Sequence, residues 1–199
     1  MAHEAPRPPV LIVHGIWDSR ARMRALEHGL IARGFAHTRA FDMKPNDGRA
    51  TIPALAEQAK RAAEALLGEH GGPIDLVGFS MGALVSRYYL QRLGGRAYVR
   101  RFISISGPHK GTLSAYALPL PGLCDMRPGS ALIRELEADA DGFGGVEVHC
   151  LYTPYNLMIV PATSSVLPGA KSVQRIGLPI HRMMITDRAA LDAIASVLR

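Results

Sequence analysis

The sequence has few cysteines and no long apolar run, and each shortage excludes a class of protein. Cys124 and Cys150 are the two cysteines in 199 residues, and neither has a neighbour at metal-ligand spacing. We therefore expect no zinc site, and the two thiols either pair or stay free. No apolar segment reaches the roughly 18 residues that a membrane helix requires, so we expect no stable membrane insertion.

Concentrated positive charge and a secretory leader are also missing. The formal net charge is +6, but the basic residues are scattered and form no tract, so we expect no nucleic-acid partner. The start, Met1 to Pro9, lacks a charged region, an apolar run and a cleavage site. A cytoplasmic protein is the expectation, and secretion through a leader outside this sequence stays an alternative.

The chain contains enough apolar residues, 48% of the total, for one full core, and we expect a single domain over residues 1–199. Apolar runs alternate with segments of helical period. This alternation predicts an α/β fold, a doubly wound and mostly parallel sheet flanked by helices. The predicted strands are Val10–Val13, Ala36–Phe41, Ile74–Gly78, Arg101–Ser106, Val146–Tyr152 and Ser172–Ile176. In such sheets the chemistry lies at the carboxyl ends of the strands.

Several polar residues and glycines mark the expected helix ends. Thr51 is the predicted cap of a helix that Gly68 ends, Ser130 caps a short helix, and Thr186 caps the closing helix. Residues 107–129 are rich in Pro and Gly and have no clear period, which indicates a long loop at one sheet edge. That loop is too short for a large helical lid.

Ser80 occupies the corner between a predicted strand and a predicted helix. The apolar strand stops at Gly78, and a pattern at helical spacing begins at Met81. This layout is typical of a nucleophile elbow, in which a sharp turn exposes the serine hydroxyl. Glycines two residues to either side, Gly78 and Gly82, remove side chains that would collide.

A serine nucleophile needs a base, usually a histidine. His181 follows the last predicted strand and precedes the closing helix, so it can reach over the sheet edge toward Ser80. We therefore predict that His181 is the general base.

The segment after the first strand predicts the oxyanion hole. The chain must turn at His14-Gly15 with open backbone amides, and the amide of Ile16 can join that of Met81 to hold an oxyanion. His14 and Gly15 are expected near the substrate, with Trp17 in the pocket wall; the alternative for His14 is a purely structural place in the turn.

Four segments in this order resemble the motifs of small bacterial lipases and esterases of the α/β-hydrolase superfamily. They are Val13-His14-Gly15-Ile16-Trp17-Asp18, Gly78-Phe79-Ser80-Met81-Gly82, Ser106-Gly107-Pro108-His109-Lys110-Gly111-Thr112 and Leu178-Pro179-Ile180-His181. The resemblance extends from Val10 to the carboxyl terminus. It implies that His109 is a residue of the acyl pocket, with a role as base the fallback.

The same resemblance places the third member of the triad after the strand that ends near Tyr152, where this chain has Asn156. An amide can orient the imidazole but cannot stabilise the imidazolium by charge, and the equivalent change in a serine protease costs about 10⁴ in turnover. Three hypotheses follow. Asn156 orients His181 in a slow enzyme; a carboxylate from Asp18, Asp42 or Asp125 replaces it; or the fold has lost catalysis.

The sequence therefore predicts a serine carboxylic-ester hydrolase that needs no metal or organic cofactor and acts on a small-molecule ester of short or medium acyl chain. A thioesterase or amidase on the same groups is the first alternative. A catalytically weak binding protein on the same fold is the second. The oligomeric state has no sequence signal.

Overall fold

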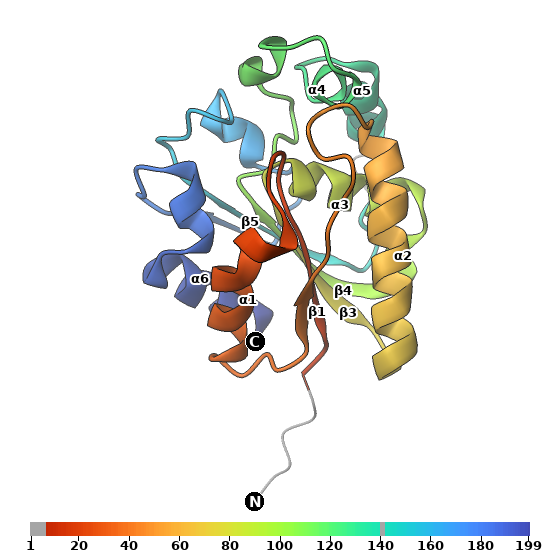
Figure 1. The fold of residues 1–199 in the computed structure, drawn as a ribbon, viewed down its shortest axis with the longest axis vertical. Helices are drawn as coiled ribbons and strands as arrows, with labels where there is room; N and C mark the ends of the chain where they lie inside the picture. The colour runs from red at the N-terminus through yellow and green to blue at the C-terminus, as the bar shows by residue number, and fades with distance from the viewer. Residues whose placement is uncertain (1–6, 140–141) are drawn as a thin grey trace, which may run out of the picture.

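The computed structural model describes residues 7–139 and 142–199, and its centre is a six-stranded parallel sheet (Figure 1). The strands are β1 (Val10–Val13), β2 (Thr38–Ala40), β3 (Ile74–Phe79), β4 (Val99–Ile105), β5 (Glu147–Tyr152) and β6 (Ser172–Arg175). Their spatial order is β2-β1-β3-β4-β5-β6, and every neighbouring pair is parallel. The predicted doubly wound α/β fold is confirmed.

Helices cover both faces of this sheet. They are α1 (Arg24–Ile31), α2 (Ile52–His70), α3 (Met81–Arg92), α4 (Pro121–Asp125), α5 (Ala131–Ala138) and α6 (Arg188–Leu198). In Figure 1, α1 and α6 lie to the left of the sheet and α2 to the right. Alternate residues of β1 supply the two cores: Leu11 and Val13 pack with α2 and α3, whereas Val10 and Ile12 pack with α1 and α6.

The strand order reverses between β1 and β3. From β1 the chain moves outward to β2, and from β3 it proceeds in the opposite direction to β6. Loops that leave two such strands diverge, which opens a crevice at their carboxyl ends where ligands of α/β proteins bind. Ile16 follows β1 and Ser80 follows β3, so both predicted site segments lie at this switch point.

Two of the predicted caps are confirmed and two helix boundaries are wrong. Thr51 Oγ1 accepts from Ala54 N at 3.3 Å, and Ser130 Oγ accepts from Ile133 N at 3.1 Å. The closing helix is capped by Asp187 instead of Thr186, because Asp187 has the extended backbone of a cap and its carboxylate accepts from Ala189 N. The second helix continues past Gly68 to His70 and ends at Gly71, which has φ 60°.

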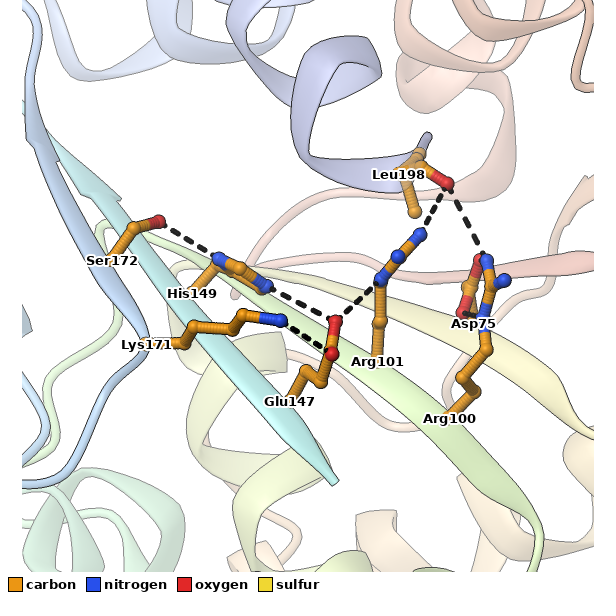
Figure 2. A network of polar contacts seen from close by, with 8 residues as sticks. All are labelled: Asp75, Arg100, Arg101, Glu147, His149, Lys171, Ser172 and Leu198. Atoms are coloured by element: carbon orange, nitrogen blue, oxygen red, sulfur yellow. Dashed lines mark hydrogen bonds and ion pairs between the residues drawn. The ribbon is translucent and has the colours of Figure 1, made fainter. Parts of the chain in front are cut away.

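A polar network ties the amino-terminal end of the sheet to the end of α6 (Figure 2). Glu147 accepts from Arg101 Nε at 2.8 Å and from Lys171 Nζ at 2.5 Å, and these two cations lower the pKa of its carboxyl to about 2. Arg101 also donates to the carbonyl of Leu198 at 2.7 Å. The network therefore links β4, Lys171 just before β6, and the end of α6, at the end of the sheet opposite Ser80.

Both cysteines are free thiols, and Cys150 is buried in β5, where burial raises its pKa to about 11. The sequence left a disulfide and two free thiols open, and the structure has two free thiols. Over the described ranges 7–139 and 142–199, no helix combines the length and the apolar character that spanning a membrane requires.

Candidate active site

Ser80 lies on a tight turn between β3 and α3 with φ 55° and ψ −126°, a conformation that non-glycine residues rarely adopt. Close packing on both sides of the turn requires glycine. A Cβ on Gly82 would lie 2.2 Å from the carbonyl oxygen of Val13, and one on Gly78 would lie 2.6 Å from Ala83 Cα. The predicted strand, turn and helix are all present, and the glycines allow α3 to approach β1.

The backbone amides of Ile16 and Met81 have no hydrogen-bond acceptor among the described residues. The hydrogen bonds of His14 explain the orientation of the Ile16 amide. Its Nε2 accepts from Met43 N at 3.0 Å, so Nδ1 carries the proton and donates to Gly15 O at 2.9 Å. Because a peptide is planar and trans, turning the Gly15 carbonyl toward His14 points the Ile16 N–H the opposite way. Met81 begins α3, where the first amides are free and the helix dipole favours negative charge.

The imidazole of His181 lies against the strand that carries Ser80. Its ring stacks on Phe79, the residue before Ser80, with centroids 4.7 Å apart and planes at 29°. Both ring nitrogens are buried and neither has a hydrogen-bond partner, and burial lowers the pKa of His181 to about 4. The structure thus brings His181 beside the Ser80 turn without a hydrogen bond to the serine.

Asn156 is buried on the loop after β5, as the sequence predicts, but its side chain is engaged locally. Oδ1 accepts from Met158 N and Ile159 N, each at 3.0 Å, while Nδ2 is buried and unpartnered. No hydrogen bond joins Asn156 to His181 in the described residues. Asn156 therefore fixes the backbone of the next residues, and the role in orienting His181 stays a prediction.

The three alternative carboxylates each have other partners. Asp42 accepts from Arg20 N at 2.7 Å, and Asp125 accepts from Ile52 N at 2.8 Å. Asp18 accepts from Arg182 Nη1 at 3.0 Å, which places it beside the segment that carries His181. None of them contacts a nitrogen of His181, since both nitrogens lack partners.

An apolar cavity of about 230 Å³ opens at Ser80. It is lined by Ile16, Trp17, Ser80, Met81, Thr112, Ser114, Ala117, Leu123, Met126, Met158 and Ile159. The predicted pocket residue Trp17 is in its wall. Sequence patterns did not identify Leu123, Met126, Met158 and Ile159 as pocket residues. Leu123 lies in α4, a short helix inside residues 107–129, which were predicted to be a long loop, and Met158 and Ile159 lie on the irregular segment after β5.

His109, His14 and Gly15 are not among the residues that line this cavity. His109 is fully buried, its Nε2 lies 2.6 Å from Ser104 Oγ, and burial holds its pKa well below the usual value. It lines a separate cavity of about 240 Å³ together with Arg87. His109 therefore lines a different cavity from Ser80, and His14 and Gly15 lie behind the wall of the Ser80 cavity, where His14 orients the peptide between Gly15 and Ile16.

Exposed apolar side chains lie on the segments that follow the carboxyl ends of four strands, and two of them, Trp17 and Met158, line the Ser80 cavity. The strands are β1, β4, β5 and β6, and the side chains are Trp17, Leu113, Tyr116, Leu118, Tyr155, Leu157, Met158 and Ile180. Leu157 is 86% exposed, an unusual position for leucine. Exposed apolar surface therefore reaches the cavity at Trp17 and Met158.

The fold is that of the α/β-hydrolases, and lipases are among its structural neighbours. The mature lipase BlEst2 of Bacillus licheniformis superposes with a TM-score of 0.84 at 14% identity, over 98% of this chain and 93% of that one. A lipase B of Aspergillus fumigatus has a TM-score of 0.82 at 16% identity, over 96% and 52%. A monoacylglycerol lipase of Paleococcus ferrophilus has a TM-score of 0.69 at 14% identity, over 96% and 95%.

The sequence identifies the family more narrowly. Residues 9–142 match the family of palmitoyl protein thioesterases, and the chain belongs to that family. Comparison with curated proteins by sequence gives no match. Family and fold together support a hydrolase activity.

Proposed function

We propose that this protein is a serine hydrolase that cleaves carboxylic esters through an acyl-enzyme on Ser80. One observation carries the proposal: a serine with φ 55° shares an apolar cavity with Ile16 and Met81, whose backbone N–H groups have no acceptor within residues 7–139 and 142–199. Backbone N–H groups that lack an acceptor and lie beside a nucleophile can donate to the oxyanion that forms during acyl transfer and stabilise it.

The reaction begins when Ser80 Oγ attacks the carbonyl carbon and His181 accepts its proton. The carbonyl oxygen becomes an oxyanion that receives hydrogen bonds from Ile16 and Met81. Collapse of this intermediate breaks the bond to the alcohol, which leaves with the proton from His181. Water, deprotonated by the same imidazole, then attacks the acyl carbon; the bond to Ser80 Oγ breaks, His181 returns the proton to that oxygen, and the acid is released.

His181 performs this role without a hydrogen-bond acceptor behind it. Stacking on Phe79 restrains the ring, and the unpartnered nitrogens leave one free to face Ser80 once substrate is bound. Catalytic hydrogen bonds are often loose before substrate binds. No carboxylate of the described residues accepts a hydrogen bond from the ring, which leaves the imidazolium uncompensated, so we expect turnover below that of enzymes with a full triad.

The cavity indicates an apolar acyl group. Its walls are largely methionine, leucine and isoleucine, and its volume of about 230 Å³ suits a short or medium chain. A thioesterase is the second candidate function, because residues 9–142 match the palmitoyl protein thioesterases. Comparing kcat/KM for an octanoyl oxygen ester and an octanoyl thioester separates the two functions.

Labelling with a fluorophosphonate tests the proposal. We expect the probe to modify Ser80, as located by mass spectrometry, and the modification to disappear in Ser80→Ala and His181→Ala. Ser196→Ala, which removes an exposed serine of α6, is the matched control and should label normally. Folded protein that takes up no label would instead favour the non-catalytic binding protein.

A further inference from the structure

An ion pair joins the two segments that hold the oxyanion donor and the base. Asp18 lies two residues after Ile16, and Arg182 follows His181. Arg182 Nη1 donates to Asp18 Oδ1 at 3.0 Å, and its Nη2 donates to the carbonyl of Arg22 at 3.0 Å. The guanidinium therefore binds the segment after β1 at two points.

The loop that carries Asp18 is held in a strained conformation. Trp17 has φ 56°, and hydrogen bonds restrain both sides of it: Trp17 N donates to Asn46 O at 3.0 Å, and Arg22 Nη1 donates to Trp17 O at 3.2 Å. Asn46 Nδ2 also donates to the carbonyl of Asp18. Such a conformation persists only where its surroundings determine it.

The carboxylate reaches the back of the Ser80 turn. A Cβ placed on Gly15 would lie 3.0 Å from Ser80 Cβ and 3.4 Å from Asp18 Oδ2, so both atoms border the same point. The Asp18 side chain is 9% exposed and that of Arg182 is 41% exposed. The pair therefore extends from the protein surface to the immediate surroundings of the serine.

We propose that Asp18 and Arg182 form a positioning pair that keeps the Ile16 amide and the His181 imidazole in one geometry around Ser80. This inference rests on the proposed function. Asp18 contacts neither nitrogen of His181, so it acts through Arg182 and is no substitute for the triad acid. A misplacement of about 1 Å can lower turnover 10²-fold.

The partial exposure of the pair makes its two effects separable. Arg182 is the exposed partner. Asp18, whose side chain is only 9% exposed, keeps a second cation when Arg182 is neutralised, because Arg22 Nη1 lies 3.7 Å from its Oδ1. Losing the Arg182 charge therefore costs little folding stability. Breaking the pair should leave the unfolding temperature nearly unchanged while it lowers kcat. A residue that served folding alone would lower both together.

A double-mutant cycle on the full-length chain tests the pair. Asp18→Asn, Arg182→Gln and the double variant are compared for kcat and KM on a water-soluble ester, and for fluorophosphonate labelling rate. We expect each single change to lower kcat roughly 10- to 100-fold with little change in KM. The double variant should lose no more than either single one, and Arg182→Lys should recover part of the loss because it keeps the charge.

Glu69→Gln is the matched control, since it breaks the Arg39–Glu69 pair, 2.7 Å long and remote from the cavity lining. It should leave kcat unchanged. Losses that multiply in the double variant, unchanged kcat in the single ones, or a parallel fall in unfolding temperature would each overturn the positioning role. Wild-type protein that resists the probe would overturn the proposed function itself, whereas labelled wild type with equally reactive variants overturns the pair alone.

Discussion

The imidazole of His181 stacks on the phenyl ring of Phe79, which lies 102 positions earlier in the sequence and directly before Ser80. The stacking buries the ring and leaves both of its nitrogens without partners. One face of the imidazole therefore packs on an apolar ring, and no carboxylate of the described residues accepts a hydrogen bond from the imidazole. This environment favours the neutral imidazole, which is the form that a general base needs.

The pH dependence of catalysis should reflect this burial. The pKa of His181 is lowered to about 4, so the base is neutral down to that pH and becomes protonated below it. We expect kcat/KM to stay constant from neutral pH down to about 5 and to fall tenfold per unit below about 4. A pH–rate profile with a stable ester measures this. An acid limb near 6.5 would show that the ring is hydrated in the free enzyme.

Asn156→Asp should raise turnover. One carboxylate oxygen can keep the two hydrogen bonds from Met158 N and Ile159 N, while the second replaces the unpartnered Nδ2 with an acceptor. We expect kcat to rise at least about tenfold, with about 10⁴ as the upper limit. Asn156→Ala is the control: it frees the wall at Met158 and Ile159 and should raise KM. No gain in the aspartate variant would point to a carboxylate elsewhere.

Two Gly→Ala changes should have opposite effects on stability. In Gly82→Ala the new methyl would lie 2.2 Å from Val13 O, so α3 must move away from β1. We expect a loss of about 3 kcal/mol or a failure to fold. Gly68→Ala adds a methyl to an exposed site of α2 with no atom within 4 Å, and it should stabilise by about 0.5–1 kcal/mol. Chemical denaturation measures both, and equal effects would contradict the close contact at Gly82.

The network at the far end of the sheet should make folding sensitive to acid. Arg101 and Lys171 lower the pKa of Glu147 from 4.5 to about 2, so its contribution is present above pH 4.5 and is lost as the pH falls through 2. Glu147→Gln should lower stability at pH 7 by about 1 kcal/mol. Below pH 2 the variant and the wild type should converge. Thermal unfolding followed across this pH range tests the difference, and a constant gap would argue against a charge effect.

The sequence predicted the sheet and the Ser80 turn because both depend on local pattern. Continuous apolar runs such as Val10–Val13 are typical of buried parallel strands, and β1 has these bounds. The glycines around Ser80 indicated in the sequence that α3 packs closely against β1.

Less apolar strands were placed less well: the predicted strand Ala36–Phe41 is only Thr38–Ala40 in the structure, and Arg101–Ser106 is Val99–Ile105. Helix ends were harder to predict from the sequence. Thr186 and Asp187 are both good capping residues, and only the backbone conformation shows that Asp187 is the cap.

The details of the site depend on contacts that no motif encodes. His109 belongs to a family-like segment, yet its hydrogen bond with Ser104 directs it into a different cavity. Asn156 lies on the predicted loop, but two neighbouring amides use its oxygen. The sequence gives no signal for a role of Arg182, because its partner, Asp18, lies near the opposite end of the chain. Long-range pairing of this kind requires the folded geometry.

The placement of the base after β6 has a consequence for heat inactivation. β6 pairs with β5 alone, and its Val173 is 46% exposed, whereas the serine and both amide donors follow interior strands β1 and β3. If the pairing between β5 and β6 opened locally, His181 would move away from Ser80 while the rest of the fold stayed intact. Catalysis should therefore fail at a lower temperature than the one at which the molecule melts, and cooling should restore it.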